Sequence, residues 1–477
     1  MRRIFSCLCL SAFLLVGGIE TTVAQTAKTK IQNAYQQFKG ASAMTNGQAS
    51  LTVINAKTGE IVFEDNSKVG LPTASTLKVM TSITALDLLG PDYTFPTSLY
   101  YTGTIDSIGT LHGDIIIEGS GDPTLGSDRY AEHNAETLLN KWRTAIVELG
   151  VKQIEGRIIA DDSKYKGNQV PGTWMWTDMG NYYGAGISSL NWKENKLEVQ
   201  FTPGRPGSMT QLASHNVPPF YQLVNEVSTG ANQSGDNVYG YAAPYSDIIY
   251  LRGTYGADLK KTIELSSPDP ALVLAYDLSK ALLTDSIIVA DSLISTASLL
   301  KIQGEPQTWN QGKQKLLTVQ SPKLIDIVHW FNQKSINLYG EALLKVIGGI
   351  SANKFETEEA ASLVAKYWEN KLKIPVGEIK TYDGSGLSPQ NRVTSNALAR
   401  IMQYAKGRPW YQGFLKSLPT INGTSMKSGT IGGTLGYTGY QKAADGQEYT
   451  FSLLINNYHG GAGRMRQQMF KLLDVLK

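Results

Sequence analysis

A serine and a lysine three positions apart, Ser75 and Lys78, form the pair whose spacing most directly indicates nucleophilic chemistry. On a helix, positions i and i+3 share a face, so the hydroxyl and the amine can come within hydrogen-bond reach. At a helix N-terminus, the serine hydroxyl and backbone N–H lie at the positive end of the helix dipole. Partial burial disfavours the charged form of a lysine, which suits it to take a serine proton. We therefore expect Ser75 as the nucleophile and Lys78 as its general base.

Spacing alone does not single out this pair, because Ser298 with Lys301 and Ser351 with Lys354 have the same separation. Histidine chemistry has less support from the sequence. The chain has five histidines, none with an obvious serine or carboxylate partner: His112, His133, His215, His329 and His459. A hydrolase in this chain would therefore need a lysine base rather than a Ser-His-Asp triad.

A second candidate motif, Ser335-Ile336-Asn337, lies in a short break between two helical patterns. Its hydroxyl could relay a proton to a leaving amine, and its amide could hold a substrate carbonyl. The same pattern recurs at Ser189-Leu190-Asn191 and at Ser351-Ala352-Asn353. The structural alternative is that the motif caps a helix beginning at Leu338.

The third candidate is Lys427-Ser428-Gly429-Thr430, in a predicted strand near the C-terminus. A lysine and hydroxyls on a strand edge can bind the terminal carboxylate of a substrate, and Gly429 lets the substrate backbone lie close. The backbone N–H groups of Ser75 and Thr430 could together form an oxyanion hole. Lys57-Thr58-Gly59 has a similar composition, but it falls in a predicted hairpin turn.

The elements that must position these residues come from both ends of the chain. Two alternating runs, Ala49–Asn55 and Glu60–Glu64, predict a hairpin, and two further strands flank Ala444-Asp445-Gly446. Paired with each other, these strands would form one antiparallel sheet. Predicted helices cover Thr26–Phe38 and Arg464–Leu476. The helix that carries Ser75 and Lys78 follows Pro72, stops at Gly90-Pro91, and has apolar positions at Val79, Met80, Ile83, Leu86 and Leu89.

The middle of the chain, from about 93 to 300, has short β-type runs separated by Gly, Pro and Asn, which indicate one or two β-rich inserted domains. The clearest runs are Gly113–Glu118, Gln153–Ala160, Lys196–Thr202 and Asp247–Arg252. Helical periodicity returns at Ser321-Pro322, which we interpret as a cap followed by proline at the first helical position. A further helix is predicted over Leu338–Val346.

Composition and the N-terminus limit the class of protein. The 477 residues are 42% hydrophobic and 18% charged, and the net charge of +3 gives no case for nucleic-acid binding. Met1-Arg2-Arg3 followed by apolar Ile4–Gly18 is typical of a secretory signal, with cleavage expected after Thr22-Val23-Ala24. An uncleaved anchor is the alternative. Cys7 and Cys9, the only cysteines, lie inside the apolar run, so the mature protein would have no thiol chemistry. We expect an exported, periplasmic protein with at most peripheral membrane contact.

In their order along the chain, the three motifs resemble those of the D-alanyl-D-alanine carboxypeptidase/endopeptidase family, the class C low-molecular-mass penicillin-binding proteins. The segments Gly119–Leu125 (GSGDPTL) and Asp383–Ser388 (DGSGLS), the latter followed by Asn391, are similar to other conserved segments of that family. We interpret the first as a fold feature and the second as a tight turn. The long interval between Ser75 and Ser335 is also typical of the family, which carries nested domains there.

The resemblance implies an α/β (α+β) fold of the penicillin-binding/β-lactamase-like transpeptidase type, with an antiparallel sheet flanked by helices and interrupted by β-rich inserted domains. The predicted domains are a signal peptide over 1–24, a catalytic domain over 25–92 and 301–477, an inserted domain over 93–191 and 263–300, and a nested domain over 192–262. It also implies a serine peptidase that cuts stem peptides ending in D-Ala-D-Ala, without metal or cofactor, and that β-lactams acylate.

The resemblance implies that Ser75 is the acylated nucleophile and Lys78 its general base. Ser335 and Asn337 correspond to the second motif of the family, and the strand with Lys427, Ser428 and Thr430 corresponds to the strand that binds the carboxylate. Ser428 departs from the commoner threonine but keeps a hydroxyl. Two alternatives stay open. One is a β-lactamase or esterase on the same scaffold, although the expected Glu-x-x-x-Asn pattern is missing between the second and third motifs. The other is a non-catalytic wall-binding protein.

Overall fold

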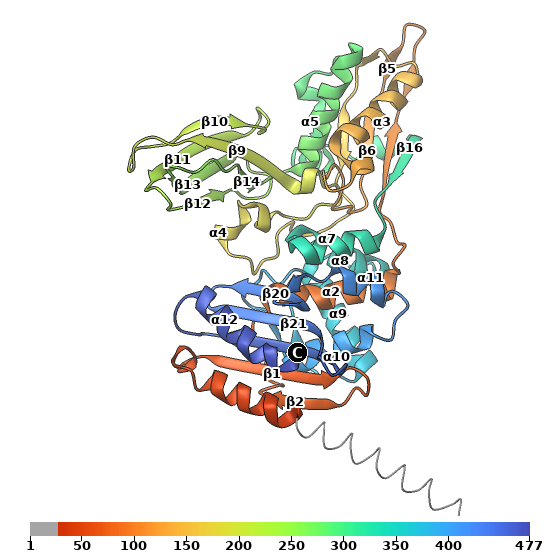
Figure 1. Cartoon of the computed structure of the whole chain (residues 1–477). Coiled ribbons are helices and arrows are strands. Elements are labelled where there is room, and N and C mark those ends of the chain that lie inside the picture. Colours follow the sequence, from red (N-terminus) through yellow and green to blue (C-terminus); the bar gives the residue numbers. More distant parts are fainter. Residues whose placement is uncertain (1–26) are drawn as a thin grey trace, which may run out of the picture. The chain divides into compact units, whose positions relative to one another are not determined.

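One antiparallel sheet joins the two ends of the chain in the computed structural model, which describes residues 27–477 (Figure 1). The predicted signal peptide lies outside the described residues. The chain divides into two compact units. The first unit contains the described residues up to Ile83, with Ala365–Thr381 and Pro389–Lys477, and the second contains Thr84–Val364 and Tyr382–Ser388.

The sheet of the first unit has the strand order β19-β20-β21-β22-β1-β2. All neighbouring pairs are antiparallel, and β1 from the early hairpin pairs along its whole length with β22 near the C-terminus, as predicted. The strands are β1 (Gln48–Asn55), β2 (Ile61–Asp65), β19 (Thr420–Ile421), β20 (Thr424–Ile431), β21 (Thr434–Lys442) and β22 (Glu448–Asn456).

Helices cover both faces of this sheet. The helix over residues 27–39 and the helix α12 (Ala462–Leu473) share a core with it that includes Tyr35, Phe451 and Met469. The other face carries α10 (Ser395–Ala405), which contacts β22 and β1. β22 is therefore buried on both faces over almost all of its length. The remaining elements of this unit are α11 (Tyr411–Ser417), β17 (Ile379–Lys380) and β18 (Arg392–Val393), while α2 (Leu77–Leu89) and α9 (Thr357–Leu372) extend into the second unit.

The second unit has a mixed five-stranded sheet with the order β15-β8-β6-β3-β16. β8 pairs in parallel with β6 and with β15, and the helices α3 (Ala135–Glu148) and α5 (Pro270–Leu282) contribute to the same core. The predicted strand Gln153–Ala160 is two strands, β7 (Gln153–Ile154) and β8 (Ile158–Asp161). It breaks where Gly156 passes against the backbone of Gly113. The other strands are β3 (Pro96–Tyr101), β4 (Thr104–Ile105), β5 (Thr110–His112), β6 (Ile115–Glu118), β15 (Ile294–Thr296) and β16 (Gln314–Gln320).

Two three-stranded sheets build the nested part of this unit, in the orders β10-β9-β14 and β11-β13-β12. β13 pairs in parallel with β11 and antiparallel with β12. The predicted strand Lys196–Thr202 is β9, and the predicted run Asp247–Arg252 lies largely within β13 (Ile248–Gly256). The remaining strands are β10 (Gln211–His215), β11 (Gln222–Gly230), β12 (Asp236–Tyr241) and β14 (Ile263–Ser266). The predicted domain boundaries stay predictions.

The helical part of the second unit begins later than the sequence predicts. α7 (Leu324–Lys334) has Lys323 as its N-cap, so Ser321 and Pro322 do not start it. The Ser321 hydroxyl instead accepts the backbone N–H of Phe95. α8 (Asn337–Ala352) follows, and short helices α4 (Trp176–Met179) and α6 (Ala297–Ile302) lie elsewhere in the unit. No helix within residues 27–477 is both long and apolar enough to span a bilayer.

Replacing Phe451 by alanine tests whether this sheet is the core of the first unit. Phe451 is fully buried on β22, so we expect the substitution to lower the free energy of unfolding of this unit by ~3–5 kcal/mol. Thermal or urea unfolding measures the loss. Ile61→Ala, on the edge strand β2 with 47% of the side chain exposed, is the control. An equal loss in both variants would contradict this assignment of the core.

Candidate active site

Ser75 and Lys78 meet at the start of α2. A short 3-10 turn over Ala74–Thr76 leads into the helix, and the Lys78 amine donates a hydrogen bond of 2.9 Å to the Ser75 hydroxyl. Lys78 is fully buried, whereas Ser75 is partly accessible. The expected contact between the two side chains is therefore present, with the hydroxyl at the surface and the amine behind it.

The backbone before Ser75 is held in an uncommon conformation. Ala74 has a φ of +44°, a region that costs a residue with a Cβ ~1–3 kcal/mol. The turn is held in place by Thr76, whose N–H and hydroxyl both donate to the carbonyl of Thr73, at 3.2 and 2.7 Å. Such strain persists only where the surrounding contacts over-determine it, and it fixes where the Ser75 hydroxyl points.

Strand β20 lies directly against this turn. A Cβ placed on Gly429 would come within 2.6 Å of the Thr73 carbonyl and 3.0 Å of the Ser75 backbone nitrogen. Only glycine allows this approach without moving the strand or the turn. The short edge strand β19 pairs with β20 only at Thr424 and Ser425. The part of β20 from Lys427 onward is therefore next to Ser75 and beyond the reach of β19, as an extended substrate would require.

The side chains around Gly429 place two cations along β20. Lys427 is almost fully buried, and burial lowers its pKa to about 8. Its amine donates to the carbonyl of Ser428 at 3.1 Å. Arg466 of α12 donates to the hydroxyl of Thr430 at 3.1 Å. The strand thus offers hydroxyls at Ser428 and Thr430 flanked by two basic groups, which suits an anionic ligand.

Arg466 was not among the residues singled out from the sequence. A basic residue in the last predicted helix was the only available signal, and nothing in the sequence indicated which strand that helix would cover. Its placement follows from the packing of α12 on the sheet, where Met465 and Met469 on either side of it are buried.

Ser335 and Asn337 belong to the second unit and are described with it. Ser335 ends α7 in a left-handed conformation with a φ of 57°, and Asn337 is the first residue of α8. The N-cap of α8 is Ile336, without a side-chain capping bond, so the alternative that this motif caps a helix at Leu338 is not what the structure shows. The Asn337 amide donates instead to the backbone carbonyl of Tyr183 at 2.8 Å.

The segment Asp383–Ser388 is a tight turn fastened to α8. The buried carboxylate of Glu341 accepts the N–H groups of Gly384 and Ser385, at distances of 2.9 to 3.2 Å. The Asp383 carboxylate accepts N–H groups of Gly386 and Ser388 within the turn and the indole N–H of Trp174. Glu341 was missed as a support residue, although it lies one helical turn after Asn337.

Hydrogen bonds and an ion pair occupy side chains of the competing motifs. The Ser298 hydroxyl donates to Asp162 at 2.6 Å, and Lys354 pairs with Glu359 at 2.8 Å, so neither repeats the Ser75–Lys78 contact. The amide of Asn191 is buried against the backbone of Asp122. Lys57-Thr58-Gly59 is the turn between β1 and β2, as predicted.

The expectation that no histidine has a carboxylate partner is wrong for His112. Its two ring nitrogens lie 2.7 Å from Glu155 and 3.1 Å from Asp106, and these carboxylates raise its pKa. The β4–β5 hairpin brings Asp106 close, and the parallel pairing of β5 with β7 brings Glu155 close. Both nitrogens are occupied by carboxylates, so the cluster does not supply a base for a serine.

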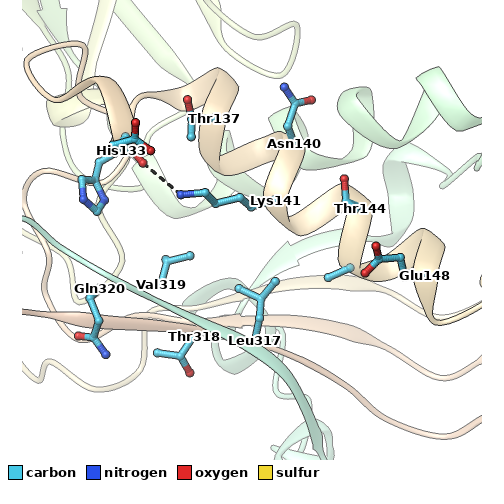
Figure 2. Close-up of a pocket in the computed structure, with 12 residues that line it drawn as sticks. His133, Thr137, Asn140, Lys141, Thr144, Glu148, Leu317, Thr318, Val319 and Gln320 are labelled. Carbon is cyan, nitrogen blue, oxygen red and sulfur yellow. Dashed lines mark hydrogen bonds between the residues drawn. The ribbon is translucent and has the colours of Figure 1, made fainter.

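The second unit also has a surface groove. A groove of about 870 Å³ lies between α3 and the edge strand β16, lined by residues that include His133, Lys141, Leu317 and Val319 (Figure 2). The Lys141 amine reaches the backbone oxygen of Glu132 at one end. None of the predicted site residues lines this groove. Within the described residues, no cluster of His, Cys, Asp and Glu could hold a metal ion.

Comparison with known proteins identifies the family of the chain. The sequence pattern of the D-Ala-D-Ala carboxypeptidase 3 (S13) family matches residues 31–475. The chain is 25% identical to a D-alanyl-D-alanine carboxypeptidase of Actinomadura sp. (strain R39) over 454 residues, which cover 89% of this chain and 80% of that protein.

Solved structures show the same fold. The crystal structure of penicillin binding protein 4 (dacB) from Haemophilus influenzae is similar with a TM-score of 0.75 at 20% identity, over 93% of this chain and 97% of that one. The same protein complexed with a β-lactam gives a TM-score of 0.71 at 20% identity, over 94% and 99% of the two chains. These similarities confirm the predicted fold class.

Replacing Gly429 by alanine tests whether the approach of β20 to Ser75 matters for reactivity. The new methyl group would push the strand away from the turn, and we expect labelling of Ser75 by a fluorophosphonate to slow by ~10-fold or more. Gly432→Ala is the matched control, because a Cβ there meets no atom within 4 Å. Wild-type labelling rates in Gly429→Ala would show that the close approach is dispensable.

Proposed function

Because this chain belongs to the D-Ala-D-Ala carboxypeptidase 3 (S13) family, and is thus a D-Ala-D-Ala carboxypeptidase, we propose that it cleaves peptidoglycan stem peptides through an acyl-enzyme on Ser75. The observation that carries this proposal is the hydrogen bond from the buried Lys78 amine to the Ser75 hydroxyl. Strand β20 lies beside it, and Gly429 allows the strand to approach Ser75 closely. We extend the proposal to endopeptidase action on cross-links, because both reactions break a peptide bond after the same D-alanine carbonyl.

In the proposed reaction, Lys78 in its neutral form takes the Ser75 proton as the hydroxyl oxygen attacks the carbonyl carbon. Charge develops on the carbonyl oxygen, and the N–H groups of Ser75 and Thr430 stabilise it. The C–N bond then breaks, and the leaving amine receives a proton through the Ser335 hydroxyl. Water attacks the resulting ester, which releases the shortened peptide and restores Ser75. Asn337 holds a carbonyl of the bound peptide.

The substrate carboxylate is proposed to bind along β20. Lys427 supplies a positive charge, and the hydroxyls of Ser428 and Thr430 donate hydrogen bonds. Arg466 adds a second charge at Thr430. This arrangement supports the recognition of a carboxylate close to the scissile bond. Cleavage of cross-links would require the same strand to accept the residue that carries the cross-linking amine.

β-Lactams are proposed to acylate Ser75, because their amide presents a reactive carbonyl next to a carboxylate, as the substrate does. Penicillin binding protein 4 from Haemophilus influenzae has been solved in complex with a β-lactam. We propose that this chain acts outside the cytoplasm, in the periplasm, because the sequence over residues 1–24 is typical of an export signal. Contact with the membrane would be peripheral at most.

Mixing the mature protein with benzylpenicillin tests the acyl-enzyme. We expect the intact mass to increase by one penicillin in the wild type and to stay unchanged in Ser75→Ala. Lys78→Arg keeps a positive charge at every working pH, so its adduct should form at least ~100-fold more slowly. Mass spectrometry over time measures all three.

The remaining outcomes distinguish the alternatives. An adduct that lasts only seconds, with penicillin consumed, would replace the proposal by a β-lactamase. An adduct in Ser75→Ala would remove Ser75 as the nucleophile. No adduct and no hydrolysis of a D-Ala-D-Ala peptide would leave a wall-binding protein without catalysis.

The pKa of Lys427 predicts how recognition depends on pH. A buried lysine with a pKa of about 8 is charged below that pH and neutral above it, so attraction to a substrate carboxylate should weaken as pH rises through about 8. We expect kcat/KM for a soluble D-Ala-D-Ala peptide to fall above pH 8 relative to the same peptide with a C-terminal amide. The amide control cancels pH effects on Ser75 and Lys78. A constant ratio from pH 7 to 10 would rule out Lys427 as the titrating group.

A further inference from the structure

Exposed aromatic side chains occur on the nested part of the second unit and on the segment from α4 to the 3-10 turn Tyr182–Gly184, which packs against it. Trp176 is 52% exposed, Tyr182 50%, Tyr239 44% and Tyr250 36%, and Tyr241 is half-buried between them. We call these five residues the aromatic band. Rings of this size usually lie in a core or an interface, so several exposed rings on neighbouring segments indicate a binding surface.

The alternation of β12 and β13 puts the strand residues of the band on one face. Tyr239 pairs with Arg252 and Tyr241 pairs with Tyr250 across the two strands. Their neighbours Val238 and Leu251 are buried on the opposite face, where they belong to the core of the unit. Three tyrosines therefore point outward from adjacent positions of the sheet.

α4 lies beside β12 (Figure 1). A glycine pair fixes the segment from α4 to the 3-10 turn Tyr182–Gly184 against that strand. A Cβ on Gly180 would lie 2.2 Å from the carbonyl of Gly240, and a Cβ on Gly240 would lie 2.4 Å from the carbonyl of Gly180. The Gly240 N–H also donates to the side chain of Asn181 at 3.1 Å. This contact brings the ring of Trp176 to 6.0 Å from that of Tyr241.

A polar pair lies within the band. The Arg252 guanidinium is 5.2 Å from the ring centre of Tyr250 and 5.8 Å from that of Tyr241, and it forms an ion pair with Glu226 of β11. The pair is partly exposed and close to neutral overall. It offers both hydrogen-bond donors and acceptors beside flat apolar rings, which a purely apolar partner would not use.

The aromatic band is connected through Tyr183 to Asn337, one of the predicted site residues. The ring of Tyr182 lies 5.5 Å from that of Tyr183, edge to face. The backbone carbonyl of Tyr183 accepts the amide of Asn337, the first residue of α8. A ligand on the band would therefore be a neighbour of the Ser335-Ile336-Asn337 motif within the same unit.

We infer that the aromatic band binds the glycan strand of peptidoglycan, which is a polymer of N-acetylated pyranose rings. The inference rests on the proposed function. The C–H face of a pyranose packs on the face of an aromatic ring, whose negative quadrupole attracts polarised C–H groups. Arg252 and Glu226 would bind sugar hydroxyl and acetamide groups between the rings.

Other occupants fit the surface less well. A membrane-binding surface is rich in unpaired lysine and arginine, whereas Arg252 is neutralised by Glu226. The centre of a stable interface between copies is depleted of acidic side chains, whereas this band has Glu226 paired with Arg252 inside it. A row of several rings matches a repeating polymer better than a single small ligand.

Co-sedimentation with insoluble peptidoglycan, and with glycan strands stripped of their peptides, tests the inference. We expect Trp176→Ala/Tyr250→Ala to lose at least ~10-fold in apparent affinity for both materials, because two stacking surfaces are removed. Cleavage of a soluble D-Ala-D-Ala peptide should stay within about twofold of wild type. Tyr250→Phe, which keeps the ring, should bind as wild type does.

Tyr276→Ala is the matched control. Tyr276 is a partly exposed tyrosine on α5 whose ring also lies beside a cation, Lys280, at 4.7 Å. Thermal unfolding verifies that each variant is folded, and Tyr250→Ala alone replaces the double variant if the latter is not. We expect Tyr276→Ala to sediment with glycan as wild type does.

Several results would overturn the inference. Wild-type binding of the double variant to stripped glycan would remove the band as the glycan site. Loss of binding to intact peptidoglycan alone would assign the band to the stem peptide. A change in oligomeric mass, or in binding to anionic lipid vesicles, would assign it to a second copy or to a membrane. Wild-type protein that binds glycan but does not cleave the soluble peptide would contradict the proposed function and leave the glycan site intact.

Discussion

The first unit depends on one constraint. It must bury the amine of Lys78 and still hold it in a hydrogen bond to the hydroxyl of Ser75 at the surface. Burying an amine costs free energy unless its hydrogen bonds are satisfied, so the surroundings of Lys78 must be specified closely. The strained Ala74, the turn fixed by Thr76 and the approach of Gly429 all serve this one contact. Each restricts where the Ser75 hydroxyl can be, and none has an obvious purpose without it.

The architecture of the sheet explains how such strain is tolerated. β20 and β21 are joined through β22 to β1, so strands from both ends of the chain form one sheet beside the turn at Ser75. The core under this sheet is continuous from the helix over residues 27–39 to α12. A rigid sheet of this kind can hold the left-handed Ala74 in place, because relaxing it would require moving several paired strands.

In the second unit, α8 has the corresponding role of anchoring polar groups. Along this one helix, Asn337 bonds the carbonyl of Tyr183, Tyr339 bonds Glu194, Glu341 holds the Asp383–Ser388 turn and Lys345 bonds the carbonyl of Phe355. Tyr339, Glu341 and Lys345 are buried and Asn337 is partly buried. Asn337, Tyr339 and Glu341 tie the helix to segments distant in sequence. Because buried polar groups are costly when unpaired, this network specifies one arrangement of loops around α8. The aromatic band is connected to the network through Tyr183.

The sequence by itself determined what depends on near neighbours. The strands of the terminal sheet, the helix after Pro72, the break at Ser335 and the contact of Ser75 with Lys78 follow from side-chain periodicity and i, i+3 spacing. The tertiary structure decided between three serine-lysine pairs with the same spacing. Ser298 is hydrogen-bonded to Asp162 and Lys354 forms an ion pair with Glu359, so the pair that remains is Ser75 with Lys78. The tertiary structure also placed Arg466 at Thr430, Glu341 under its turn and two carboxylates around His112. Apart from the Lys354–Glu359 and His112–Asp106 contacts, these contacts join residues far apart in the chain. Their geometry follows from how whole elements pack, which periodicity within one element does not encode.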